Sequence, residues 1–217
     1  MEPLTPQQQL VCTALGLTSL PETKEDLDAA LLQLESLELN ALTNIAPSLP
    51  KPPSMKSGSV ASRLLKLQQF IENFQYNHTG RKFINLKKTE GMYRVSRTSK
   101  QIIQDGLPIK CIEAVFLGAY LTLNNKNILR LPIAFKSRVN GDNTFQHIVM
   151  AVAHGPLNDK KWGSIGLSRA KSLMYKKSIY NSLASLLMEF KLAYEKEHHE
   201  LLFIYVGKYF KSDAGAM

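Results

Sequence analysis

Cysteine is scarce in this 217-residue chain, which contains only Cys12 and Cys111. Two cysteines cannot make the disulfide framework that stabilises small secreted domains, so both are expected to be free thiols in a reducing compartment. Long apolar runs are also missing: no stretch reaches the ~18 residues that span a bilayer. The N-terminus lacks the basic and apolar regions of a signal peptide. These absences predict a cytosolic protein that is not inserted in a membrane.

Several functional signatures are missing as well. The sequence has no internal repeat, no spacing of residues typical of a metal site and no glycine-rich loop of the kind that binds phosphate. We therefore expect neither a metal nor an organic cofactor. Hydrophobic residues make up 44% and charged residues 21%, which is ordinary for a globular protein. The length suits one sizeable domain or one domain with an appendage.

Acidic residues are in the minority, and their distribution is uneven. The formal charge is +9, yet residues 1–50 carry −6, which leaves +15 on the rest of the chain. A basic face of this kind favours an acidic partner, such as a nucleic acid, an anionic surface or an acidic protein tail. The alternative is a surface that is simply well solvated.

The N-terminal part is predicted to be helical. Residues 6–17 suit a short helix, and residues 23–45 a longer one that places leucines and alanines on one stripe. Thr23 and Asp26 resemble a capping box at its start. The stripe can pack on its own domain or bind a partner helix. The proline-rich residues 46–58 exclude regular structure and form a linker.

The rest of the chain changes from helical to strand patterns. Helices are predicted at 60–74, 98–105, from Cys111 to Tyr120 and at 178–198; strands are predicted at 83–86, 128–135, 144–154, 162–167 and 201–206. Helices followed by a mostly antiparallel sheet indicate the α+β class. We expect two parts: an acidic helical region with its linker (1–58) and a catalytic domain (59–217).

Cys111 is the most informative residue of the chain. It follows Pro108 and opens an apolar run, so it is expected in the first turn of a buried helix. There the helix dipole and unpaired N–H groups favour a thiolate, which makes Cys111 a candidate nucleophile. A buried lone cysteine is more commonly an inert core residue. Chemistry at this position needs a histidine from elsewhere in the chain.

His147 and Ser168 are candidate partners. His147 lies in a predicted strand, where alternation puts it on the face of Phe145 and Val149, toward a core on which the cysteine helix could pack. It would act as the general base. Ser168 follows the next predicted strand and could hold the imidazole in one tautomer. The simpler interpretation is a histidine that is part of the core.

These residues also carry a family resemblance. Four segments resemble the vasohibins in sequence and in order: Tyr76-Asn-His-Thr-Gly80, Leu107-Pro-Ile-Lys-Cys-Ile-Glu-Ala-Val115, Phe145-Gln-His-Ile-Val149, and Gly166-Leu-Ser-Arg169 with Leu173-Met-Tyr-Lys176. The similarity runs from about residue 67 to residue 207. The resemblance implies a transglutaminase-like cysteine protease fold and a tubulin carboxypeptidase that removes the C-terminal tyrosine of α-tubulin.

The resemblance also implies the roles of individual residues. A Cys-His-Ser triad would consist of Cys111, His147 and Ser168. Substrate binding would fall on the following residues: Tyr76, Lys110, Arg169, Lys87 and Lys88. Arg169 can form two hydrogen bonds with a terminal carboxylate, whereas Lys110 acts as a point charge. These two cations are also expected to lower the thiol pKa.

Partners follow from the same resemblance. The expected substrate is the glutamate-rich tail of α-tubulin, which a basic domain attracts, and the expected location is the cytoplasm at microtubules. Vasohibins work with a small helical binding protein, whose place the helix at 23–45 could also take. Gln146 stands where the vasohibins carry arginine, so one charge for the tail is missing. Two alternatives stay open: a non-catalytic basic module for microtubules or nucleic acid, although RNA-binding motifs are absent, and a peptidase for another acidic C-terminus.

Overall fold

The structure is a computed structural model that describes residues 6–36, 49–84, 91–139, 141 and 143–210. The chain divides into two compact units, residues 1–48 and residues 49–217. None of the helices in these described ranges is long and apolar enough to cross a bilayer.

The first unit contains α1 (Pro6–Ala14) and α2 (Lys24–Ser36). The predicted capping box at the start of α2 is confirmed, because the Asp26 N–H donates to Thr23 Oγ1 at 3.1 Å and the Thr23 N–H donates to Asp26 Oδ2 at 3.2 Å. On the leucine stripe, Ala30 is buried while Leu27 is half exposed. The predicted continuation of the helix to residue 45 lies outside the described residues.

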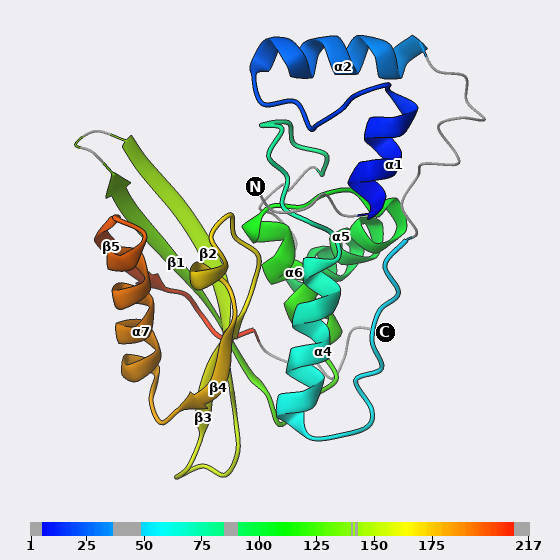
Figure 1. The fold of residues 1–217 in the computed structure, drawn as a ribbon. Helices are drawn as coiled ribbons and strands as arrows, with labels where there is room; N and C mark the ends of the chain where they lie inside the picture. Colours follow the sequence, from blue (N-terminus) through cyan, green and yellow to red (C-terminus); the bar gives the residue numbers. More distant parts are fainter. Residues whose placement is uncertain (1–5, 37–48, 85–90, 140, 142, 211–217) are drawn as a thin grey trace. The chain divides into compact units, whose positions relative to one another are not determined.

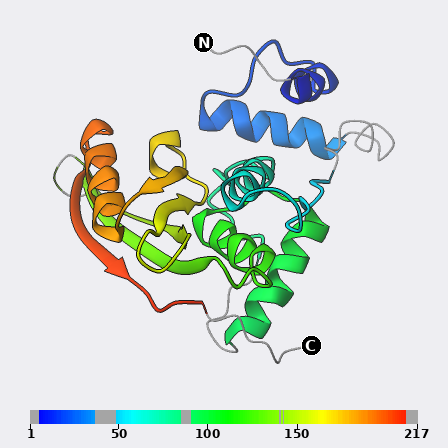
Figure 2. The ribbon, with the colours of Figure 1, turned by 90° about the horizontal axis from the view of Figure 1, so that it is seen from below.

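Three helices of the second unit lie on one side of its sheet (Figures 1 and 2). They are α4 (Val60–Glu72), α5 (Gly91–Asp105) and α6 (Cys111–Leu121). Two of them, α4 and α6, pack against the sheet, and α5 packs against α6. The helix α4 begins at an N-cap serine, Ser59, whose hydroxyl accepts from the Ser62 N–H. The helix α5 is longer than the sequence predicts and ends before Gly106, which has a φ of 63°.

The sheet has five strands in the order β4-β3-β2-β1-β5, and every neighbouring pair is antiparallel. The strands are β1 (Leu129–Val139), β2 (Asn143–His154), β3 (Lys161–Ile165), β4 (Lys176–Tyr180) and β5 (Glu200–Val206). The α+β class with a helical first part and an antiparallel sheet is therefore confirmed. A short 3₁₀ turn, η1 (Lys171–Leu173), lies between β3 and β4.

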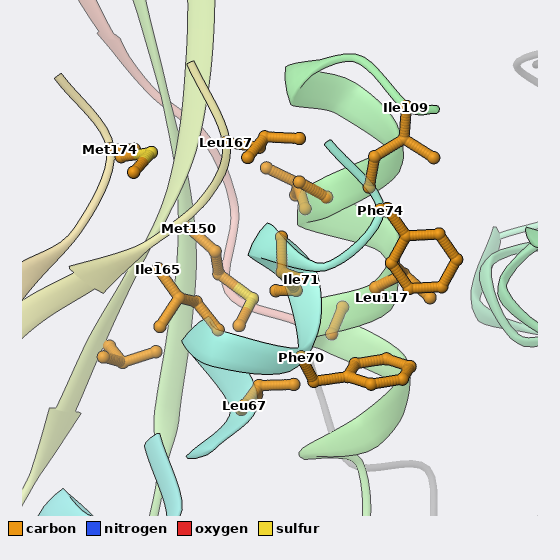
Figure 3. Close-up of a cluster of buried hydrophobic side chains, with 14 of the residues drawn as sticks. Leu67, Phe70, Ile71, Phe74, Ile109, Leu117, Met150, Ile165, Leu167 and Met174 are labelled. Carbon is orange, nitrogen blue, oxygen red and sulfur yellow. The ribbon is translucent and has the colours of Figure 1, made fainter. Parts of the chain in front are cut away.

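Side chains alternate between the two faces of the central strand β2, and each face has its own core. Met150 packs with Ile165 of β3 and Leu117 of α6 on the face covered by α4 and α6 (Figure 3). On the other face, Val149 packs with side chains of α7 (Leu183–Lys196) such as Phe190. The sheet is thus buried on both faces around β2. This packing holds the site residues at the start of β2 in place.

Two predicted elements differ from the structure. Residues 178–180, expected in the helix at 178–198, belong to strand β4, and the helix α7 begins only at Leu183 after the N-cap Ser182. Phe83 and Ile84 are not in a strand, and the rest of the strand predicted at 83–86 lies outside the described residues.

Candidate active site

Cys111 is the first residue of α6, as predicted. The residue before it, Lys110, has the extended backbone of an N-cap, and its N–H donates to Glu113 Oε2 at 3.1 Å. Glu113 is buried, with 5% of its surface exposed, and is the acidic residue of the first turn. This carboxylate therefore stabilises the start of the helix and holds the cysteine at the helix N-terminus.

The thiol of Cys111 lies at an open stretch of the edge of β2. Strand β3 pairs with β2 only from Met150 to His154, so no strand of the described chain pairs with β2 on that side before Met150. The Ile148 N–H hydrogen-bonds to the sulfur there. Burial nevertheless raises the pKa of the Cys111 thiol, and the backbone N–H groups oppose this effect without cancelling it. The predicted lowering of the thiol pKa is therefore wrong: burial and the charge of Glu113 outweigh the backbone N–H groups at the start of the helix.

His147 precedes Ile148 on β2 and has one firm hydrogen bond. Its Nε2 lies 2.7 Å from the backbone carbonyl oxygen of Leu173 in η1. Because a carbonyl oxygen can only accept, Nε2 carries the proton and Nδ1 is left as the basic nitrogen. Burial lowers the pKa of His147 to about 4, although the bond to Leu173 favours the charged form. The imidazole is therefore neutral at pH 7 and can accept a proton.

His147 shares the face of Phe145 and Val149, as predicted, but the cysteine helix does not pack on that face. The cysteine helix α6 packs on the opposite face of the sheet, against Met150 and Ile165. His147 instead lies over Phe135, with ring centroids 6.3 Å apart, on the face that α7 covers. The Cys111 thiol therefore approaches His147 along the edge of β2 at Ile148. This approach is open because β3 pairs with β2 only from Met150 onward.

Four predicted site residues line one pocket of about 320 Å³: Tyr76, His147, Ser168 and Arg169. The Cys111 and Lys110 side chains are not among its lining residues. Ser168 lies three residues beyond the end of β3, and its hydroxyl accepts from the Ala170 N–H at 3.4 Å. The hydrogen-bond partner of His147 is the Leu173 carbonyl, so the orienting role of Ser168 stays a prediction.

Tyr76 is held next to the cysteine helix by backbone pairing. The Asn77 N–H donates to the Ile109 carbonyl at 2.8 Å, and the Ile109 N–H donates to the Gln75 carbonyl at 3.1 Å. Burial raises the pKa of the Tyr76 hydroxyl, and so does the negative charge that Cys111 carries when it ionises, whereas the charge of Arg169 and a hydrogen bond with it lower that pKa. The Tyr76 segment therefore connects Cys111 to the exposed guanidinium.

Two cations border this segment from opposite ends. The Arg169 guanidinium lies over the Tyr76 ring, 5.5 Å from its centroid, and Lys110 Nζ donates to the Gly80 carbonyl at 3.4 Å. Neither cation pairs with a carboxylate in the described part of the chain. Both are available to an anionic group of a ligand. The predicted pair Lys87 and Lys88 lies outside the described residues.

Gln146 is exposed at the rim of the same pocket. It lies directly opposite Lys136 on the neighbouring strand β1. Lys136 thus supplies one positive charge beside the neutral amide of Gln146. Within the described ranges, no group of three or more His, Cys, Asp or Glu side chains is placed to share a metal ion.

Comparison with known proteins identifies the family of this chain. The family model named Vasohibin matches residues 30–217, and it extends into the region before residue 60 where no motif was evident. The chain belongs to the vasohibin family. It is 35% identical over 176 residues to "Tubulinyl-Tyr carboxypeptidase 1" of Mus musculus. That match covers 80% of this chain and 45% of the relative, so this vasohibin-family chain spans less than half of the mouse protein's length.

Sequence reasoning missed three groups of this vasohibin site. They are the carbonyl oxygen of Leu173, the hydroxyl of Tyr194 and the imidazole of His199. A backbone carbonyl has no sequence signature. Tyr194 fits the inward face of the helix predicted at 178–198, and His199 lies just after that helix, so neither residue was a candidate for the site. A tyrosine and two histidines within residues 194–199 are the signal in the sequence that could have indicated them.

The segment that carries Ser168 and Arg169 is anchored by Gln68 of α4. The side-chain amide of Gln68 pairs with both backbone groups of Gly166: it accepts from the N–H at 3.0 Å and donates to the carbonyl at 2.9 Å. Its second amide hydrogen goes to Glu72 Oε1 at 2.8 Å. Gln68 is 1% exposed, so water does not replace these bonds. The amide thus continues the hydrogen bonding of β3 where the strand ends.

The neutral state of His147 predicts a loss of stability in acid. Unfolded histidine has a pKa near 6.5, whereas the folded value is about 4, so the stabilising effect is complete above pH 6.5 and is lost as the pH falls toward 4. We expect the free energy of unfolding to fall by about 3 kcal/mol over this window from His147 alone. Urea unfolding of wild type and His147→Gln at pH 7.0 and pH 4.5, followed by the fluorescence of Trp162, measures it.

The comparison between these two proteins isolates the His147 contribution, because burial also lowers the pKa of His154 and both proteins share that effect. The variant is expected to lose less stability than wild type on acidification. An identical pH dependence of the two proteins would show that His147 ionises as freely in the folded as in the unfolded chain.

Proposed function

We propose that this chain is a cysteine-type carboxypeptidase that removes the C-terminal tyrosine of α-tubulin. The observation that carries the proposal is the neutral His147, with Nδ1 unprotonated, one residue from the backbone N–H that contacts the Cys111 thiol. Family membership and the name of the mouse relative support it. The expected location is the cytoplasm, at microtubules.

The free site favours proton transfer during attack over a preformed ion pair. Burial disfavours both the thiolate of Cys111 and the imidazolium of His147. His147 Nδ1 would take the thiol proton as the sulfur adds to the carbonyl carbon of the last peptide bond. The same proton would then pass to the nitrogen of the leaving tyrosine, and water would hydrolyse the thioester. The Cys111 N–H at the helix start is a candidate donor to the oxyanion.

The specificity for a chain end would come from two cations that have no carboxylate partner among the described residues. Arg169 can donate two parallel hydrogen bonds to a terminal carboxylate, and Lys110 adds a second positive charge beside the Tyr76–Gly80 segment. The +15 charge of residues 51–217 would attract the acidic tail that precedes the tyrosine. A small helical vasohibin-binding protein is a proposed partner for solubility and activity.

A pair of peptides tests the proposal. Both end in Glu-Glu-Tyr, one with a free carboxylate and one with a C-terminal amide, and mass spectrometry follows the release of tyrosine or its amide. We expect release from the free acid at a kcat/KM at least about 10²-fold higher than from the amide, because only the acid pairs with Arg169 and Lys110. The assay is run on the chain alone and with the small binding protein added.

Two variants in the segment after β3 test the role of Arg169, one of them as a control. Arg169→Gln is expected to lower kcat/KM for the free acid by about 10²-fold, whereas Lys171→Gln, an exposed lysine two residues further on, changes it less than about twofold. Equal cleavage of acid and amide would contradict the carboxypeptidase. Peptide binding without any cleavage, with and without the partner, would favour the non-catalytic module. Cleavage of other acidic ends but not of tyrosine would favour a related peptidase.

A further inference from the structure

Four residues that line the pocket have no role in the proposed reaction: Ser137 of β1, Phe145 of β2, Tyr194 of α7 and His199, which follows α7. We call the part of the pocket that they line its inner end, because Ser137 and Tyr194 are buried there. No aspartate or glutamate is among the described residues that line the pocket. A neutral or hydrogen-bonding ligand group suits such an end better than a cation does.

Tyr194 contributes a hydroxyl group without a partner. The residue is 2% exposed, and among the described residues its Oη has no hydrogen bond. Burial raises the pKa of this phenol, and the negative charge that Cys111 carries when it ionises raises it further, so the phenol stays a neutral donor. A buried hydroxyl without a partner costs about 1–3 kcal/mol. A ligand that accepts its hydrogen bond recovers that cost on binding.

His199 is held so that only one of its ring nitrogens is free. Its Nδ1 lies 2.9 Å from the hydroxyl of Ser137, which is 1% exposed, and its N–H donates to the Tyr194 carbonyl at 2.9 Å. The ring lies between two aromatic rings, with centroids 5.3 Å from Phe145 and 5.9 Å from Tyr194. No partner of Nε2 is found in the described part of the chain. The imidazole is thus oriented, with Nε2 left for a ligand.

We propose that this inner end is a subsite that recognises the phenol of the residue removed, through Nε2 of His199 and the hydroxyl of Tyr194. Aromatic walls combined with two free polar groups match a ligand group that is itself an aromatic ring bearing one hydroxyl. The subsite rests on the proposed function, because it assigns the side chain of the released tyrosine. It makes the chain distinguish a terminal tyrosine from a terminal phenylalanine.

Two peptides that differ by one oxygen atom test the subsite. They end in Glu-Glu-Tyr and Glu-Glu-Phe, and the quantity measured is the ratio of their kcat/KM values. Wild type is expected to favour tyrosine by at least about 10-fold, since a polar group built to bind a hydroxyl is left unpaired by its analogue. Tyr194→Phe, which removes only the hydroxyl, is expected to bring the ratio within about threefold of one.

Variants of His199 separate its two nitrogens. His199→Asn keeps a polar atom near Ser137 but has none at the place of Nε2, so the ratio is expected to fall as in Tyr194→Phe. His199→Gln puts its amide near the place of Nε2 and is expected to keep at least about a third of the wild-type ratio. His198→Asn is the control, because His198 is exposed, does not line the pocket and has a φ of 59°, which asparagine tolerates.

The same peptides, measured for binding to Cys111→Ala, make the test independent of turnover. If wild type cleaves neither peptide but the variant binds the tyrosine peptide at least about fivefold more tightly than the phenylalanine peptide, the proposed reaction fails and the subsite stands. A wild-type selectivity near one, or a selectivity that Tyr194→Phe leaves unchanged, overturns the subsite. A His199→Gln variant that loses the ratio as fully as His199→Asn does overturns the role of Nε2.

Discussion

Replacing Cys111 by alanine is expected to lower kcat/KM for a peptide ending in tyrosine at least about 10³-fold. The thiol is the atom that forms the covalent intermediate, and alanine at the first position of α6 leaves the helix start and the Lys110–Glu113 bond in place. Cys12→Ala is the matched control, because Cys12 is the second of two cysteines and lies in the first unit. It is expected to change the rate less than about twofold.

A double variant tests whether Cys111 and His147 act as one unit. His147→Gln keeps an amide that can donate to the Leu173 carbonyl but lacks the basic Nδ1. It is therefore expected to lower kcat/KM by a factor similar to that of Cys111→Ala. Because residues that act together are not additive, Cys111→Ala with His147→Gln should be no slower than Cys111→Ala alone. Losses that multiply, or tyrosine release that survives in Cys111→Ala, would mean that the sulfur is not the nucleophile.

Replacing Gln68 by alanine is expected to lower the free energy of unfolding by about 3 to 5 kcal/mol. The change leaves the N–H and the carbonyl of Gly166 without partners in the interior, at about 1–3 kcal/mol for each group, and it leaves a cavity. Ser168 and Arg169 follow directly, so a shift of this segment is also expected to lower kcat/KM by about 10²-fold. Urea unfolding followed by Trp162 fluorescence measures the stability.

The neighbouring Gln69 supplies the control for this prediction. It is exposed on the same helix, and Gln69→Ala is expected to change stability by less than about 0.5 kcal/mol. Gln68→Glu adds a second comparison, because a carboxylate accepts from the Gly166 N–H but cannot donate to the carbonyl until it is protonated. The difference in the free energy of unfolding between wild type and Gln68→Glu should therefore become smaller as the pH is lowered. Equal stability of Gln68→Ala and Gln69→Ala would show that the Gly166 bonds carry no net energy.

The elements with strong local signals were predicted well. The start of α6 at Cys111 follows from Pro108 and the apolar run behind it, and the capping box at Thr23 and Asp26 is present as predicted. Strands β1, β2, β3 and β5 agree with the predicted ranges within a few residues at either end. In each case the information lies within one turn of helix or in simple alternation, which the chain carries locally.

Strand β4 was missed because its pattern is weak and its stability comes from its neighbour. Ile179 reads as the first apolar residue of a helix, yet it is 65% exposed on β4. The strand forms because Gly163 of β3 lets the backbones approach closely: a Cβ at Gly163 would lie 2.6 Å from the Lys176 carbonyl oxygen. Such an approach between residues 13 positions apart cannot be read from periodicity.

The amino-acid sequence by itself determined the α+β class, the placement of a thiol at a helix start and the segments that carry the family resemblance, because these depend on residue types at short spacing. The tertiary structure decided the rest. It set the tautomer of His147 through the Leu173 carbonyl, raised the thiol pKa through burial, and brought Tyr194 and His199 to the inner end of the pocket. These outcomes depend on backbone groups, desolvation and contacts between distant segments, which exist only once the sheet and α7 have packed together.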